Sequence, residues 1–98
     1  MSAIMISDIT VLSLEAFETY RTRAAPVIAK YGGCYLARNG EVRVLEGQWR
    51  PRTVVVVEFP SLEQAEAWYH SPEYAHALEV RDLALTRNLI LVDGYHEK

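Results

Sequence analysis

The feature that most constrains the fold of this chain is a run of four consecutive valines, Val54–Val57, within the segment TVVVVEF. Valine favours β-strands because its branched side chain packs well on a pleated surface. A strand with one wet face alternates apolar and polar residues, whereas an unbroken apolar run is typical of burial on both faces. Leu89–Val92 is a second run of this kind. We therefore expect a β-sheet whose two faces are both covered.

Apolar periodicity and turn residues divide the rest of the chain into alternating strands and helices. Serine is a strong helix N-cap, and glycine tolerates the left-handed conformation that ends many helices. The predicted helices run from the Ser13 cap to Gly32-Gly33, from the Ser61 and Gln64 capping box to Tyr69, and from Ser71-Pro72 to about residue 84. The predicted strands are residues 3–11, 34–38, 41–46, 53–59 and 89–95.

A hairpin is predicted at Asn39-Gly40, the dipeptide that best fits a two-residue type I′ turn. It would join the strands at 34–38 and 41–46. The segment that follows, GQWRPR at 47–52, reads as a loop punctuated by glycine and proline.

The predicted order is β-α-β-β-α-β, which indicates a single α+β domain over residues 1–98 with a ferredoxin-like antiparallel sheet. Helices cover only one face of such a sheet, so a second copy of the chain is the simplest cover for the other. We expect a homodimer, with Val55 or Val57 facing the partner. The alternative is that the valines are simply strong strand formers.

Composition excludes several classes of partner. The net charge is −3 and the pI is about 5.5, which argues against nucleic acid or an anionic membrane as partner. No segment is apolar for the ~20 residues that a membrane-spanning helix needs. The single cysteine, Cys34, permits no internal disulfide and is expected to be a small buried thiol. These features favour the cytoplasm.

An ordered set of motifs resembles a known family. The set comprises YGG at 31–33, Arg38, EGQWRPR at 46–52, EFPS at 58–61, WY.SPEY at 68–74 and Arg81. It is similar to domain-of-unknown-function family 1330, which belongs to the dimeric α+β barrel superfamily. The resemblance implies that two ferredoxin-like protomers pack sheet against sheet, with the helices outside. That superfamily includes cofactor-independent monooxygenases, isomerases, stress-responsive barrels and haem enzymes, so the resemblance implies a fold and a dimer without a reaction.

Three charged residues fall where the apolar pattern predicts the interior. Asp8 lies within the first strand and Glu58 within the valine-rich strand, while Arg81 shares a helical stripe with Tyr74 and Leu85. Buried charges need partners. One interpretation is a structural ion pair between Arg81 and Glu58 or Asp8. The other is a catalytic role, in which a carboxylate moves a proton and Arg81 holds an oxyanion.

Five aromatic residues and one further charged position complete the candidate site. Apolar walls with a few converging polar groups are typical of small-ligand pockets. The ligand-binding candidates are Tyr20, Arg38, Trp49, Trp68, Tyr69 and Tyr74. The loop that carries Trp49 is interpreted as an anion-binding or gating loop, or as a plain structural turn.

No metal site or cofactor is expected. His70 and His76 are six residues apart, with Pro72 between them, so they do not share a helix face as metal-ligating pairs do. Two functions remain open. The first is a homodimer that binds a small aromatic or carbonyl-bearing metabolite between sheet and helices, as a cofactor-independent enzyme of proton transfer or isomerisation. The second is a non-catalytic ligand-binding, structural or stress-related dimer.

Overall fold

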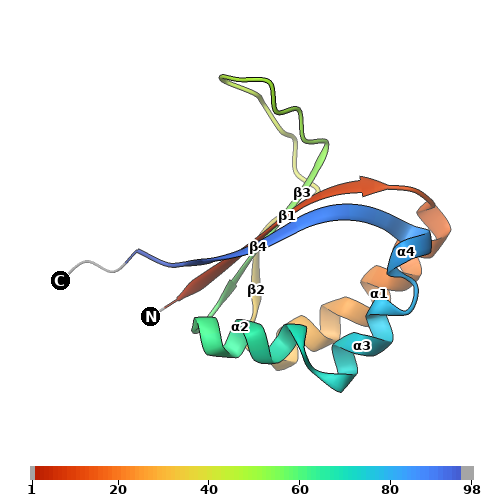
Figure 1. Cartoon of the computed structure of the whole chain (residues 1–98), viewed down its shortest axis with the longest axis vertical. Helices are drawn as coiled ribbons and strands as arrows, with labels where there is room; N and C mark the ends of the chain where they lie inside the picture. Colours follow the sequence, from red (N-terminus) through yellow and green to blue (C-terminus); the bar gives the residue numbers. More distant parts are fainter. Residues whose placement is uncertain (1, 96–98) are drawn as a thin grey trace.

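A computed structural model of the chain describes residues 2–95 and contains one antiparallel sheet with helices on one of its faces (Figure 1). The strand order is β2-β3-β1-β4, and each pair of neighbours is antiparallel. This order confirms the predicted ferredoxin-like α+β fold. The elements in chain order are β1 (Ala3–Val11), α1 (Leu14–Lys30), β2 (Cys34–Arg38), β3 (Thr53–Phe59), α2 (Leu62–Tyr69), α3 (Pro72–Leu78), α4 (Arg81–Ala84) and β4 (Leu85–Asp93).

The helix boundaries confirm the predicted caps. The hydroxyl of Ser13 accepts a hydrogen bond from the Ala16 amide at 3.2 Å. Ser61 and Ser71 do the same at the starts of α2 and α3, each at 3.0 Å. Each cap satisfies one of the four backbone donors that an α-helix leaves unpaired at its N-terminus. Gly32 follows α1 with a φ of 83°, the left-handed geometry expected there.

The predicted hairpin at Asn39-Gly40 is wrong. β2 pairs with β3, with Cys34 opposite Glu58 and Arg38 opposite Val55, and residues 39–52 form a long loop without strand structure. Within residues 2–95 the left-handed positions are Asn39, Gly32 and Gly47, so Gly40 lacks the φ that a type I′ turn requires.

Burial explains why β3 replaces the nearer segment as the partner of β2. Val57 and Phe59 are fully buried against the helices, whereas residues 41–46 are mostly exposed. Burying apolar side chains contributes more than a favourable turn sequence. Figure 1 shows the loop rising from the sheet on the side away from the helices.

The C-terminal half also differs from its prediction. The expected helix from 72 to about 84 is interrupted, because α3 ends at Leu78 and α4 begins at Arg81. β4 then starts at Leu85, four residues before the predicted strand, and it pairs with β1 along the whole length of β1. The break redirects Arg81, and the earlier start places Arg87 within the sheet.

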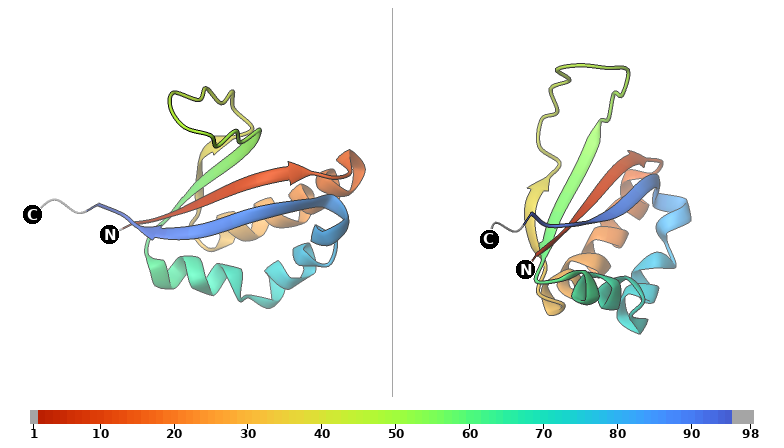
Figure 2. Two further views of the ribbon diagram at one scale, coloured as in Figure 1. Left: turned by 45° about the horizontal axis from the view of Figure 1, so that its top comes forward. Right: turned by 60° about the vertical axis from the view of Figure 1, so that its left-hand side comes forward.

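Figure 2 shows the helices on one face of the sheet, and within residues 2–95 none lies on the other. The register assigns each strand residue to one of these two faces. Met5, Ser7 and Ile9 of β1 are buried on the helix-covered face, and their partners on β3 and β4 point to the same face. The alternate positions form the open face, which the helices leave uncovered. Its apolar members are Ile4, Ile6, Val54, Val56, Ile90 and Val92.

The open face exposes apolar side chains, with Ile90 53% and Val92 43% exposed. Val55 and Val57 face the helices, so the expectation that one of them faces a partner is wrong. Val54 and Val56 face outward instead, because Val57 pairs with the inward Met5. Cys34 is exposed rather than buried, since it lies opposite the outward Glu58. No helix within residues 2–95 is long and apolar enough to cross a membrane.

Candidate ligand pocket between α1 and the sheet

A pocket lies between α1 and the helix-covered face of the sheet. Its empty volume is about 450 Å³, including the open mouth. Ligand pockets combine apolar side chains with polar groups placed to orient the ligand, and both kinds line this one. The apolar lining residues are Met5, Ile9, Phe17, Ala24, Ile28 and Val55, and the polar ones are Ser7, Tyr20, Arg21, Tyr35, Arg38, Asn39 and Arg87.

Arg87 and two tyrosines form a hydrogen-bonded group at this pocket. The Arg87 guanidinium donates from Nη1 to the Tyr20 hydroxyl and from Nη2 to the Tyr74 hydroxyl, each at 2.8 Å. The two hydroxyls also hydrogen-bond to each other. Tyr20 lines the pocket, whereas Tyr74 is fully buried behind it. One guanidinium therefore joins the pocket wall to the core.

Three elements bring these side chains together. Arg87 lies opposite Ile9 in the β1–β4 pairing, so it points toward the helices. Tyr20 lies on the buried face of α1. Tyr74 is in the first turn of α3, whose start is fixed by the Ser71 cap. The geometry of the group thus depends on the packing of α1 and α3 beneath β4.

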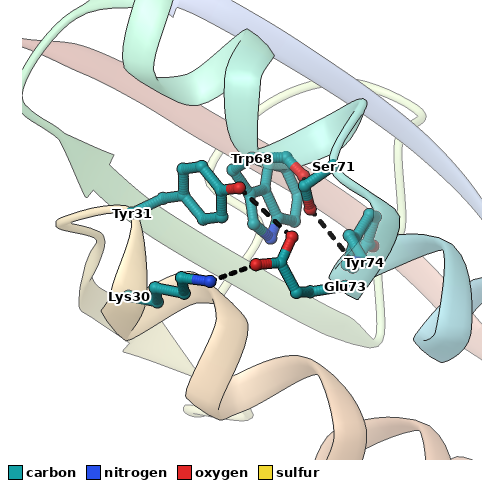
Figure 3. A network of polar contacts seen from close by, with 6 residues as sticks. All are labelled: Lys30, Tyr31, Trp68, Ser71, Glu73 and Tyr74. Atoms are coloured by element: carbon teal, nitrogen blue, oxygen red, sulfur yellow. Dashed lines mark hydrogen bonds and ion pairs between the residues drawn. The ribbon is translucent and has the colours of Figure 1, made fainter.

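An ion-pair network at the protein surface holds α3 against α1 (Figure 3). Lys30 forms a salt bridge with Glu73, and the Tyr31 hydroxyl donates to the other Glu73 oxygen at 3.3 Å. The hydrogen bond from Lys30 lowers the pKa of Glu73, and the same bond raises the pKa of Lys30. This network ties the end of α1 to the start of α3, near Tyr74.

The protonation states of the buried group follow from its surroundings. Burial raises the pKa of the Tyr74 phenol far above its ordinary value, so this hydroxyl keeps its proton. Burial lowers the pKa of Arg87, but its interactions with Tyr20 and Tyr74 outweigh burial and leave that pKa raised. Arg87 is therefore a permanent cation that only donates hydrogen bonds.

The hydrogen bonds among Arg87, Tyr20 and Tyr74 indicate which of the two phenols can donate a hydrogen bond into the pocket. Each phenol oxygen accepts from Arg87, and one hydroxyl donates to the other. If Tyr20 donated to Tyr74, the buried Tyr74 proton would have no acceptor among the described residues, and an unsatisfied buried donor costs about 1–3 kcal/mol. With Tyr74 as the donor, the proton of Tyr20 is free to point into the pocket.

Ser7 adds a second hydroxyl to the pocket. Its side chain is 1% exposed, and its Oγ has no hydrogen-bond partner within residues 2–95. Buried polar groups in native proteins are rarely left unpaired, so each exception needs an explanation. Because Ser7 lines the pocket, a bound molecule or an ordered water there can supply the missing partner.

Arg21, Arg38 and Asn39 complete the polar lining. The Arg38 guanidinium carbon lies 4.8 Å from the centroid of the Tyr35 ring, a cation–π distance. Arg21 pairs with Glu18 at 3.2 Å, but its buried Nε has no partner within residues 2–95. Burial raises the pKa of Tyr35, so that phenol is neutral at physiological pH.

The predicted ligand-binding residues lie in four different places, one of which is the open face beside Asp8, where Trp49 lies. Tyr20 and Arg38 line the pocket. Trp68 and Tyr74 are core residues, with ring centroids 4.4 Å apart, and Figure 3 shows Trp68 beneath the Lys30–Glu73 network. Tyr69 lines a separate hollow along β4, which Arg81 and the far side of Arg87 also border.

The predicted pairing of Arg81 with Glu58 or Asp8 is wrong. Asp8 and Glu58 project from the open face, as their pairing with Val54 and Ile4 requires. Arg81 lies among the helices on the other side of the sheet and pairs with its neighbour Asp82 at 3.3 Å. The break between α3 and α4 removes the continuous stripe that was expected to carry Arg81 inward.

Trp49 belongs to the open side as well. Its indole Nε1 donates to Asp8 Oδ2 at 2.8 Å, which draws the 39–52 loop onto the open face. Asp8, Glu58 and Trp49 are therefore separated by the sheet from Tyr20 and Arg87.

Sequence reasoning missed Ser7 and Arg87. Both carry the same signal, a polar residue at an inward position of an alternating strand. Ser7 lies between Met5 and Ile9, and Arg87 lies between Leu85 and Leu89. For Arg87 the signal is readable only once β4 is known to begin at Leu85.

No group of three or more metal-ligating side chains occurs within residues 2–95. The pocket lining itself contains no His, Cys, Asp or Glu among the described residues. Its donor set of hydroxyl, phenol, amide and guanidinium groups suits an organic molecule rather than a metal ion.

The sheet order, the helices on one face and the pocket between them define a ferredoxin-like α+β protein. The chain belongs to the family described as Domain of unknown function (DUF1330), whose model matches residues 2–95. This membership confirms the resemblance drawn from the sequence motifs. None of the curated proteins matches the chain.

Solved structures share the fold at low sequence identity. A protein of unknown function from Rhodopseudomonas palustris has a TM-score of 0.79 at 19% identity, with 98% of this chain and 84% of that chain covered. SnoaB, a cofactor-independent oxygenase from Streptomyces nogalater, has a TM-score of 0.67 at 13% identity, with coverages of 98% and 95%.

A third structure is described as dimeric. This protein of unknown function with a ferredoxin-like fold comes from Bacteroides fragilis. Its TM-score is 0.61 at 12% identity, with 95% of this chain and 96% of that chain covered. Likeness at these identities establishes the fold.

Proposed function

We propose that this chain is a homodimeric protein that binds a small, partly apolar organic molecule bearing a carbonyl or phenol oxygen in the pocket between α1 and the sheet. The observation that carries the proposal is the unpartnered Ser7 hydroxyl, which lines the same pocket as Tyr20. The two hydroxyls can donate hydrogen bonds to one ligand oxygen, and the six apolar side chains of the lining fit the rest of the molecule.

The homodimer part of the proposal rests on the open face. Ile6, Val56 and Ile90 lie in one row across three strands, and contiguous apolar surface of this kind marks association sites. A two-fold pairing of sheets would cover both copies at once. The Bacteroides fragilis structure with this fold is described as dimeric. The lone cysteine fits a reducing compartment, so a cytoplasmic location belongs to the same proposal.

As an enzyme, the protein would transfer a proton without a cofactor. Water at the open mouth would take a proton from the carbon next to the ligand carbonyl, and Tyr20 would donate a hydrogen bond to the carbonyl oxygen as negative charge develops there, while Arg87 and Tyr74 stabilise the Tyr20 oxygen. SnoaB is described as a cofactor-independent oxygenase and shares the fold, which is consistent with cofactor-free chemistry in such a pocket.

A second candidate is a binding protein without catalysis. The described pocket residues include no carboxylate or histidine, the usual general bases, so nothing in the described lining accepts a proton from a carbon acid. This observation favours binding alone.

The test is a titration with 2-acetylnaphthalene, which carries one carbonyl, and with naphthalene, which carries none. We expect NMR shifts at the pocket methyl groups of Met5 and Ala24. Tyr20→Phe should weaken the binding of 2-acetylnaphthalene about tenfold, which is the effect of losing one hydrogen bond. The same variant should bind naphthalene as tightly as the wild type does. Tyr95→Phe, at an 88% exposed position, is the control. Absence of shifts at the pocket would refute the proposal.

Deuterium exchange at the acetyl carbon of the same probe separates the two candidates. A proton-transfer enzyme should accelerate exchange in the wild type and not in Tyr20→Phe. Binding without acceleration would identify a binding protein.

A further inference from the structure

We infer that the molecule bound in this pocket is an organic anion, with its negatively charged oxygen at Tyr20, Ser7 and Arg87. This inference rests on the proposed function and specifies the charge of the ligand. The described residues that line the pocket include three arginines, Arg21, Arg38 and Arg87, and no aspartate or glutamate.

Arg87 is the strongest part of the argument. Its two hydrogen-bond partners are the phenols of Tyr20 and Tyr74, which are neutral groups. No carboxylate lies within salt-bridge distance of Arg87 among the described residues. A half-buried charge is more stable when it is paired, and hydrogen bonds to neutral groups leave the charge itself uncompensated. An anionic ligand supplies the missing countercharge.

The hydrogen-bonding capacity of the site points the same way. Arg87 has five N–H donors, of which the tyrosines use two. The free Tyr20 proton and the unpartnered Ser7 hydroxyl add two more donors. This surplus of donors matches an oxyanion, which accepts hydrogen bonds through several lone pairs.

The other two arginines add positive potential to the same pocket. Arg38 stacks on Tyr35 and forms no ion pair among the described residues. Arg21 is partly neutralised by Glu18, but its buried Nε remains free of partners within residues 2–95. The protein as a whole has a net charge of −3, but these three arginines make the pocket locally positive, and this positive potential would attract an anion.

The test compares two probes of nearly the same shape, 2-naphthoate and its neutral amide, 2-naphthamide. Both are titrated into the intact protein, with pocket occupancy followed at the Met5 methyl group. We expect the carboxylate to bind at least tenfold more tightly than the amide, and the difference to shrink at high salt.

Arginine variants locate the source of this preference. Arg87→Met should abolish most of the preference for 2-naphthoate over 2-naphthamide, and Arg38→Gln should reduce this preference severalfold. If Arg87→Met does not fold, Arg87→Lys, which keeps the charge, should fold and retain a preference for the carboxylate. Arg43→Gln is the matched control, because Arg43 lies exposed in the 39–52 loop and pairs with Glu41.

Each outcome bears on a different statement. Equal binding of carboxylate and amide at the pocket would overturn the anion inference and leave the proposed function standing. A preference that persists in both Arg87→Met and Arg38→Gln would also overturn the inference. Binding of neither probe would count against the proposed function as well.

Discussion

The two faces of the sheet are incomplete in opposite ways. The helix-covered face buries apolar side chains but also holds the Arg87 cation and the unpartnered Ser7 hydroxyl. The open face exposes isoleucine and valine, yet its acidic Asp8 has a partner in Trp49. One face thus lacks a countercharge and the other lacks a cover. A small ligand can supply the first, and only a surface as large as another protein can supply the second.

The largest effect is expected from a charge placed on the open face. Val56→Asp should dissociate the proposed homodimer, because the carboxylate would be buried without a partner at a cost of several kcal/mol. Light scattering should give a mass near twice 11.2 kDa for the wild type and near 11.2 kDa for the variant.

The control for this prediction is Ala67→Asp, which adds the same charge at an exposed position of α2. It should leave the mass unchanged. A monomeric wild-type protein would show that a second copy does not cover the open face.

A smaller effect is expected from a substitution on the covered face, where stability and ligand binding should change in opposite directions. Ser7→Ala removes an unsatisfied buried hydroxyl, so the ligand-free protein should become more stable by about 1 kcal/mol. For a chain of this size that corresponds to a rise in Tm of about 4–8 °C. The same variant should bind 2-naphthoate more weakly.

Thermal melts with and without the probe check this pair of effects. Ser2→Ala, at a partly buried serine outside the pocket, is the control. A loss of stability in ligand-free Ser7→Ala would mean that the hydroxyl already has a partner, and the pocket would lose its strongest indication of a ligand.

The smallest effect concerns the surface network that supports Tyr74. Glu73→Gln should lower the Tm slightly at neutral pH, because it removes the charge that pairs with Lys30. The pKa of Glu73 is lowered in the folded protein, so its contribution is present above the ordinary carboxyl pKa and is lost as the pH falls through the folded value.

Melts across the acidic range test this dependence. The Tm difference between wild type and Glu73→Gln should vanish in acid. Glu66→Gln, an exposed carboxyl on α2, should show a smaller difference at neutral pH. A difference that persists in acid would show that the Glu73 charge does not stabilise α3.

Local signals in the sequence predicted much of the fold. The serine caps at Ser13, Ser61 and Ser71 and the left-handed Gly32 were predicted correctly, because each depends on hydrogen bonds or backbone angles within a few residues. The fold class and the family also followed from the order of the elements and motifs. For the candidate pocket, Tyr20 and Arg38 were identified, and Arg87 and Ser7 were missed.

The sequence by itself thus determined most of the elements, the fold class and the family of this protein. Only the tertiary structure decided that β2 pairs with β3 across a long loop, that β4 begins at Leu85, and that Asp8 and Glu58 face away from Arg87. The physical reason is that a shift of one residue in a strand moves every side chain to the other face. Register is set by which distant apolar residues bury one another, and that choice is not written in any local stretch of the chain.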